Sequence, residues 1–174
     1  ARAQELTQTL VSAAQRQLLS PRIFDLVEFV EALLPQIEQT CGDDIRVESS
    51  FEVRDLRVRI DPERFREAIL QLARNARDAL ASGGGVVTLA VAHETMRCDG
   101  HGDEPWVVLR VHDTATNSEA ADVAFEAFDE TGLLHRLGVW GVAGLIRQSG
   151  GFVRVARSEH GTTFAIHLPR ARAT

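Results

Sequence analysis

The clearest hydrophobic pattern in the 174-residue sequence lies between Asp61 and Ser82. Apolar residues recur in this stretch at steps of three and four, which places them on one face of a helix. These residues are Phe65, Ile69, Leu72, Ala76 and Leu80. Asp61 followed by proline is a typical helix start, and the three glycines after Ser82 are a typical helix end. The pattern therefore predicts a helix over residues 61–82 with one buried face.

A polar ridge runs along another side of the same predicted helix. Glu67, Gln71, Asn75 and Asp78 follow one another at steps of four, four and three. Such a ridge is usually a solvated surface. However, Asn75 precedes the small residue Ala76, and a carboxamide oxygen in that setting can bind Mg²⁺ without crowding a phosphate group. The ridge is therefore either a solvent-facing surface or part of a site for a metal-bound phosphate.

The rest of the sequence alternates between helix and strand patterns. Before the central helix, we expect helices at 1–19 and 26–40, separated by Ser20-Pro21, and strands at 45–51 and 56–60. After it, we expect strands at 86–92, 106–112, 152–156 and 163–168, a polar loop at 93–105, and helical segments at 119–128 and 139–149. Strands placed between helices in this way are typical of a layered α/β domain.

Composition narrows the classes of protein that fit this pattern. Hydrophobic residues make up 44% of the chain and charged residues 25%, which is ordinary for a globular domain. The net charge of −6 argues against a general nucleic-acid binder. No apolar run reaches membrane length, and the two cysteines, Cys41 and Cys98, provide no disulfide framework. We therefore expect a cytoplasmic domain without membrane contact. Because the sequence begins at Ala1 and not at Met, we expect it to belong to a longer protein.

Motifs within these elements resemble those of a known family. Asn75-Ala-Arg-Asp-Ala, preceded by Asp61-Pro and Leu70-Gln-Leu, resembles the N box of the histidine-kinase ATP-binding domain, a member of the GHKL ATPase superfamily. Further motifs follow in the family's order. They are Asp113 at a strand end, Phe125-Glu-Ala-Phe128 like the F box, Gly138 in the second glycine box, and His160-Gly-Thr-Thr-Phe164 like the third. The resemblance covers about residues 20 to 170.

The resemblance implies a fold and a set of site residues. The fold is α/β, a two-layer sandwich of a mixed β-sheet against about three helices. The cofactors are ATP and Mg²⁺, with Asn75 on the metal and Asp113 reading the exocyclic amine of adenine. The nucleotide-binding residues that it implies are Asn75, Asp78, Asp113, Ala115, Gly138, Thr162 and Thr163. No catalytic residue is expected in this chain, because its first histidine is His93 and the phosphoacceptor histidine of the family lies on a preceding helical hairpin.

The same resemblance implies domain boundaries and partners. Residues 1–20 would be the end of a dimerisation helix, or alternatively an N-terminal helix packed on its own domain. Residues 21–171 would be the ATP-binding domain. The partners would be the dimerisation and histidine-phosphotransfer hairpin of the same protein and the receiver domain of a response regulator. The parent protein would be a homodimer.

Several positions depart from the family pattern. Gln71 replaces the first asparagine of the N box, and Ala115 and Asn117 stand where the family has glycine. The stretch Leu134–Val139 keeps only Gly138 of the phosphate-binding box, and the lid before it is short. Two main functions therefore stay open. The chain is the catalytic domain of a two-component sensor histidine kinase, or it is a non-catalytic module of the same fold that docks to other proteins. An anti-sigma-factor kinase is a third, less favoured reading.

Overall fold

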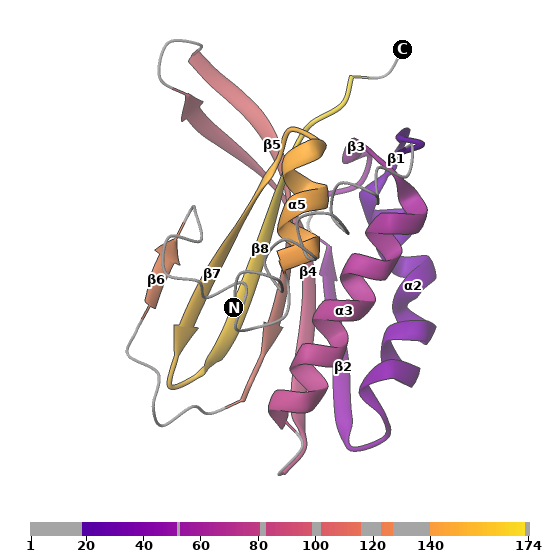
Figure 1. Cartoon of the computed structure of the whole chain (residues 1–174), viewed down its shortest axis with the longest axis vertical. Coiled ribbons are helices and arrows are strands. Elements are labelled where there is room, and N and C mark those ends of the chain that lie inside the picture. Colours follow the sequence, from indigo (N-terminus) through magenta and orange to yellow (C-terminus); the bar gives the residue numbers. More distant parts are fainter. Residues whose placement is uncertain are drawn as a thin grey trace, which may run out of the picture.

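The computed structural model describes six stretches of the chain, which are residues 19–51, 53–80, 83–98, 102–115, 123–126 and 140–172. Within them, a six-stranded β-sheet carries three helices on one face (Figure 1). This arrangement confirms the predicted two-layer α/β sandwich. The expectation of a dimerisation helix at residues 1–20 falls almost wholly outside the described residues, as do the lid and Gly138.

The sheet is mixed, with the strand order β2-β4-β5-β8-β7-β6. Its strands are β2 (Ile45–Phe51), β4 (Gly85–Cys98), β5 (Gly102–Asp113), β6 (Val123–Glu126), β7 (Phe152–Ser158) and β8 (Gly161–Pro169). Strands β2 and β4 are parallel, and all the other neighbours are antiparallel. The closing hairpin of β7 and β8 confirms the prediction for residues 152–168. In the antiparallel part, alternate side chains face the helices, as period-two geometry requires.

The three helices are α2 (Leu26–Cys41), α3 (Pro62–Leu80) and α5 (Trp140–Gln148). All three were expected from the sequence, and their ends lie within two residues of the expected ones. Helix α2 begins where Asp25 Oδ1 accepts a hydrogen bond from the backbone N–H of Glu28 at 3.1 Å. Among the described residues, no helix has both the length and the apolar character needed to cross a membrane.

Asp61 performs two tasks at the start of α3. Its Oδ1 accepts from the backbone N–H groups of Glu63 and Arg64, both at 3.1 Å, which is N-terminal capping. Its Oδ2 accepts from the backbone N–H of Ser20 at 2.9 Å. These hydrogen bonds, that from Ser20 above all, lower the pKa of the Asp61 carboxyl. The Asp61 carboxylate thus caps the N-terminus of α3 and also binds the backbone of Ser20, shortly before strand β1 (Arg22–Asp25).

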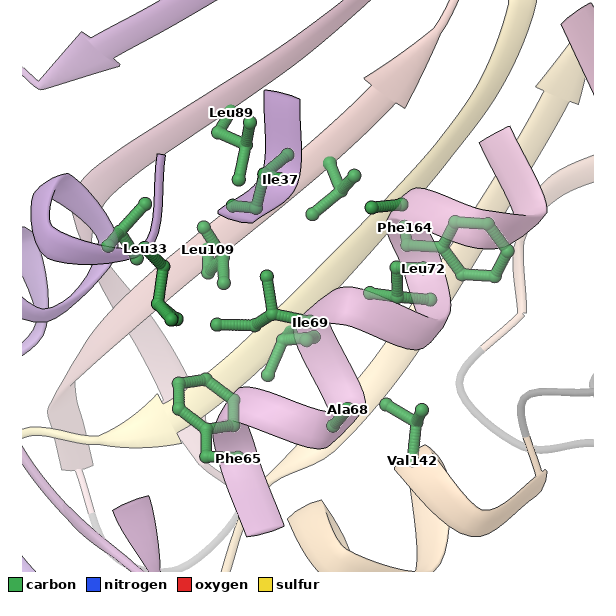
Figure 2. Close-up of a cluster of buried hydrophobic side chains, with 14 of the residues drawn as sticks. Leu33, Ile37, Phe65, Ala68, Ile69, Leu72, Leu89, Leu109, Val142 and Phe164 are labelled. Atoms are coloured by element: carbon green, nitrogen blue, oxygen red, sulfur yellow. The ribbon is translucent and has the colours of Figure 1, made fainter. Parts of the chain in front are cut away.

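The hydrophobic core lies between α3 and the sheet. Figure 2 shows Phe65, Ile69 and Leu72 of α3 among side chains of the sheet that include Leu109 and Phe164. Each of these five side chains is at most 3% exposed. The predicted apolar face of α3 is therefore confirmed, because all five residues that define it are buried. Helix α3 packs between α2 and α5, so it is the central helix of this layer.

The polar loop predicted at 93–105 is wrong. Most of this segment forms the two paired arms of the β4–β5 hairpin, with Thr95 opposite Pro105 and Met96 opposite Glu104. Figure 1 shows this hairpin projecting beyond the part of the sheet that the helices cover. Because neither of its faces is buried there, its side chains need not alternate between apolar and polar. The sequence pattern therefore gave no strand signal.

Two other expectations also need correction. The helical segment predicted at 119–128 is wrong at 123–126, where the chain forms the edge strand β6 and pairs with β7. A short apolar run is ambiguous between helix and strand, and pairing to the free edge of β7 decides it. The strand expected at 56–60 exists as β3 (Arg57–Ile60), but it lies outside the main sheet. It pairs with β1 (Arg22–Asp25), which the sequence did not predict.

Candidate functional site

Asp113 occupies the end of strand β5 on the face that the helices cover. Asp113 continues the series of buried apolar residues Val107, Leu109 and Val111 on that face. Although it is an acidic residue, it is only 4% exposed. The backbone N–H of Ala115 donates to its Oδ1 at 3.1 Å, and the backbone of Thr162 also bonds to the carboxyl group. Burial nevertheless raises the pKa of Asp113, because the charged form loses its hydration. A carboxylate in this position retains acceptor capacity for a ligand that approaches from the helix side.

Gly161 allows the close approach that builds this corner. A Cβ atom at this position would lie 1.7 Å from the backbone oxygen of Asp113, and its φ of +133° also disfavours any residue with a side chain. With glycine in place, strand β8 begins directly beside the end of β5. Thr162, which is 7% exposed, consequently sits opposite Asp113 in the strand register.

The polar ridge of α3 is organised by a chain of hydrogen bonds. Arg74 donates to Gln71 Oε1 from Nε at 3.2 Å and from Nη2 at 3.1 Å. Gln71 Nε2 in turn donates to Asn75 Oδ1 at 3.3 Å. Gln71 therefore orients Asn75 from the place where the family has its first asparagine.

The structure brings some of the expected site residues together and separates others. Asp113, Ala115 and Thr162 form one buried corner at the ends of β5 and β8. Asn75 belongs to the second half of α3, which runs toward the same end of the sheet in Figure 1. Asp78 is exposed and pairs with Arg77 at 3.0 Å.

Thr163 lies away from this corner. Its hydroxyl is 2.9 Å from His112 Nδ1, and both residues belong to the face of the sheet opposite the helices. Gly138 lies outside the described residues.

Asn75 fits a magnesium ion only as one ligand among several. In the part of the chain that the structure describes, no three His, Cys, Asp or Glu residues are grouped so that they could hold a metal ion. Mg²⁺ usually keeps several waters and binds to proteins through one or two oxygens together with phosphate groups of a substrate. A single half-buried carboxamide oxygen on α3 suits that mode of binding.

Arg157 is a member of this corner that sequence reasoning missed. It lies on β7 directly opposite Thr162, which itself pairs with Asp113 on the next strand. The alternation along β7 contained the signal, because Val153 and Val155 are buried on the helix side and Arg157 is the next residue in that series. A charged residue that continues an apolar face is unusual unless it has a partner.

A family model described as histidine kinase-, DNA gyrase B- and HSP90-like ATPase matches residues 60–172. The chain belongs to this ATPase family. The matched residues include α3, Asp113 and the β7–β8 hairpin, which are the elements that build the candidate site. The family resemblance inferred from the sequence motifs is therefore confirmed.

Relatives of the chain include sensor kinases. It is 33% identical over 181 residues to the sensor kinase CckA of Brucella abortus, an alignment that covers 97% of this chain and 19% of CckA. Solved structures that share the fold include those of AdeS and ShkA. The histidine kinase AdeS of Acinetobacter baumannii has a TM-score of 0.66 at 17% identity, covering 98% of this chain and 77% of AdeS. Full-length ShkA has a TM-score of 0.61 at 24% identity, covering 90% and 32% of the two chains. The chain thus spans about a fifth of the length of CckA.

Proposed function

We propose that this chain is the ATP-binding catalytic domain of a two-component sensor histidine kinase. The observation that carries the proposal is the buried Asp113 at the end of β5, held by the backbone of Ala115 and Thr162. A buried carboxylate discriminates strongly, because it accepts hydrogen bonds with defined directions and repels acceptors. In this proposal it accepts from the exocyclic amine of adenine. The ShkA structure named above is a complex with AMPPNP, which supports nucleotide binding by a protein that contains this fold.

Asn75 would contribute a ligand to Mg²⁺, and Gln71 would hold its carboxamide in position. When bound, Mg²⁺ supplies charge neutralisation for the phosphate groups. The γ-phosphoryl group of ATP would pass to a histidine on a helical hairpin that precedes residues 21–171 in the parent protein. The residues of this chain would bind and orient the nucleotide, and such positioning accounts for most of phosphoryl-transfer catalysis.

The partners in this proposal are other parts of a signalling system. They are the dimerisation hairpin of the same protein, within a cytoplasmic homodimer, and the receiver domain of a response regulator. A solved complex of the histidine kinase ThkA with the response regulator TrrA supports this kind of assembly, because ThkA shares the fold with a TM-score of 0.56 at 18% identity. The domain itself would contact neither nucleic acid nor membrane.

One observation favours a second function, that of a non-catalytic module of the same fold. Ala115, which stands where the family has glycine, is 6% exposed and belongs to the hydrophobic core. Its methyl group occupies space beside Asp113 that a glycine would leave to the base. In this alternative the domain acts by docking to other proteins and binds nucleotide weakly or not at all.

Calorimetric titration with Mg²⁺-ATP distinguishes the two functions. We expect the wild type to bind at micromolar affinity and Asn75→Ala to bind about tenfold or more weakly, since a lost metal ligand costs at least ~1.4 kcal/mol. Glu67→Ala is the matched control, because Glu67 lies on the same ridge two turns earlier and is exposed. It should bind like the wild type. The absence of binding by folded wild-type protein at millimolar nucleotide would favour the docking module.

A further inference from the structure

The last hydrogen bonds between strands β4 and β5 include an unusual acceptor. The register that sets Val87 opposite Asp113 places Val86 opposite Thr114. In an antiparallel hydrogen-bonded pair, each residue donates to the carbonyl oxygen of the other. Thr114 N–H does donate to the carbonyl oxygen of Val86, at 3.1 Å. In the other direction, however, Val86 N–H donates to the hydroxyl oxygen Oγ1 of Thr114, at 3.0 Å. The Thr114 hydroxyl therefore takes the place of the Thr114 carbonyl.

This change of acceptor lets the chain leave the strand at Thr114. Strand β5 ends at Asp113, and the N–H of Ala115 donates back to Asp113 Oδ1 at 3.1 Å. Such a bond from a carboxylate to the backbone two residues on requires a turn. A bond from Val86 N–H to the carbonyl of Thr114 would instead continue the extended strand. The hydroxyl thus ends β5 at the point where the candidate site begins.

The start of strand β4 leaves room for this hydroxyl. A Cβ atom on Gly85 would lie 2.8 Å from Thr114 Oγ1 and 2.6 Å from Cδ2 of Leu80, so a larger residue would displace one of them. Leu80 is the last residue of α3 and is 5% exposed. Thr114 therefore joins the end of β5 to the start of β4, beside the end of the helix that carries Asn75.

We propose that Thr114 is a positioning residue of the nucleotide site, whose hydroxyl holds Val86 N–H and thereby keeps Ala115 bonded to Asp113. This inference rests on the proposed function, because Asp113 is the carboxyl group assigned to adenine. Thr114 is exposed, so water can replace its hydroxyl as the partner of Val86 N–H at little cost in stability. Removing the hydroxyl should consequently rearrange the corner of Asp113 without unfolding the domain.

Thr114→Val tests this role, because valine matches threonine in shape but has no hydroxyl group. The regular acceptor for Val86 N–H is then the carbonyl oxygen of residue 114, and that bond would extend β5 and draw Ala115 away from Asp113. We expect Mg²⁺-ATP affinity to fall by about three- to tenfold, which is the usual effect of one lost hydrogen bond. Calorimetric titration of the full chain measures it.

Two further variants control for the substitution itself. Thr114→Ser keeps the hydroxyl and should bind Mg²⁺-ATP within about twofold of the wild type. Thr88→Val is the matched control, because Thr88 lies on the same strand as Val86, opposite His112 and on the face of the sheet away from the helices. It should bind Mg²⁺-ATP like the wild type.

A second readout requires no nucleotide. Burial raises the pKa of the Asp113 carboxyl, and the hydrogen bond from Ala115 N–H acts in the opposite direction. An NMR titration should therefore give Asp113 a higher pKa in Thr114→Val than in the wild type, together with faster hydrogen exchange at the Ala115 amide. A purely structural Thr114 would lower the unfolding temperature without changing either quantity.

Each outcome has a defined meaning. Wild-type affinity in Thr114→Val would overturn this inference and leave the proposed function intact. A fall in affinity with no change at Asp113 and Ala115, or an equal fall in Thr114→Ser, would also overturn the inference alone. Failure of folded wild-type protein to bind Mg²⁺-ATP would overturn both. If Thr114→Val does not fold in a thermal-unfolding control, Thr114→Ala replaces it with the same expectations, because alanine also lacks the hydroxyl.

Discussion

The two faces of the six-stranded sheet each contain a buried ionisable residue, but in different surroundings. On the helix-covered face, Asp113 ends a series of fully apolar positions and is 4% exposed. On the opposite face, His167 is 2% exposed and stacks on the ring of Phe152, with 4.4 Å between ring centroids. Trp106 packs edge-on against the same phenylalanine at 5.1 Å. The same fold thus buries one acid and one base on its two sides.

What separates the two residues is how far the fold satisfies their polar atoms. His167 Nδ1 lies 3.3 Å from the carbonyl oxygen of Ala165, and its Nε2 lies 3.4 Å from Glu94 Oε2. Glu94 is also paired with Arg110, so both ring nitrogens of His167 have protein partners, although Nε1 of the neighbouring Trp106 has no acceptor among the described residues. Asp113 receives backbone N–H groups but still has acceptor capacity, beside an arginine with a free donor. The comparison indicates that His167 serves packing and that the corner of Asp113 is the better candidate for binding.

The largest expected effect tests the core of the helix-covered face. Ile69→Ala should lower the free energy of unfolding by about 2–5 kcal/mol, because Ile69 is 1% exposed and its removal leaves a cavity. Phe152→Ala on the opposite face should cost less, about 1–2 kcal/mol, because Phe152 is only partly buried. Urea denaturation measures both. Equal losses would show that the two faces contribute equally to the core, contrary to this account.

A second variant separates binding from stability at Asp113. Asp113→Asn removes the charge but keeps an oxygen for the N–H of Ala115. We expect Mg²⁺-ATP affinity to fall by about ten- to a hundredfold, as for the loss of a charge-assisted hydrogen bond. The fold disfavours the ionised carboxyl, since burial raises the pKa of Asp113, and its contribution to stability therefore declines as pH rises through that pKa.

At pH 7 the free energy of unfolding of Asp113→Asn should accordingly equal or exceed that of the wild type. Titration calorimetry and urea denaturation of the same preparation measure the two quantities. A variant that loses stability but binds ATP normally would reverse the roles assigned to the two faces.

The smallest expected effect concerns pH and the opposite face. Burial lowers the pKa of His167 below its ordinary value of 6.5, so the unfolded chain binds a proton more readily than the folded one. Stability from this group is complete above about pH 6.5 and is lost as the pH falls from there through the folded-state pKa. His167→Gln should flatten this part of the stability profile and leave ATP affinity unchanged. Denaturation curves collected between pH 5 and pH 8 measure this pH dependence of the free energy of unfolding. If stability falls just as steeply with falling pH in His167→Gln, His167 is not its cause.

The elements that the sequence predicted well are those whose signals are local. Helix α3 has its cap at Asp61, its apolar face and its terminating glycines within one continuous stretch. Strand β6, strand β1 and the pairing of β1 with β3 were not predicted, because their pairing depends on partners far away in the chain. The arms of the β4–β5 hairpin lack alternation because they extend beyond the helices.

The residues of the candidate site also divide into those with a local sequence signal and those whose surroundings depend on distant parts of the chain. Asn75 and Asp113 could be proposed from the sequence, because a motif and a strand end identify them within a few residues. The role of Gln71 required the hydrogen bonds of the folded helix, and the position of Arg157 required the register of three strands. Thr163 was grouped with Thr162 by sequence, but alternation along β8 sends its side chain to the opposite face, toward His112.

The most direct test of the central claim is to map ATP binding onto the two faces by NMR. Amide chemical shifts of the domain would be followed during titration with Mg²⁺-ATP. We expect the largest changes at Asp113, Ala115 and Thr162 and along the second half of α3, with small changes around Phe152 and His167. Saturable changes centred on Phe152 and His167, or none at all at the Asp113 corner, would contradict the assignment of binding to the helix-covered face.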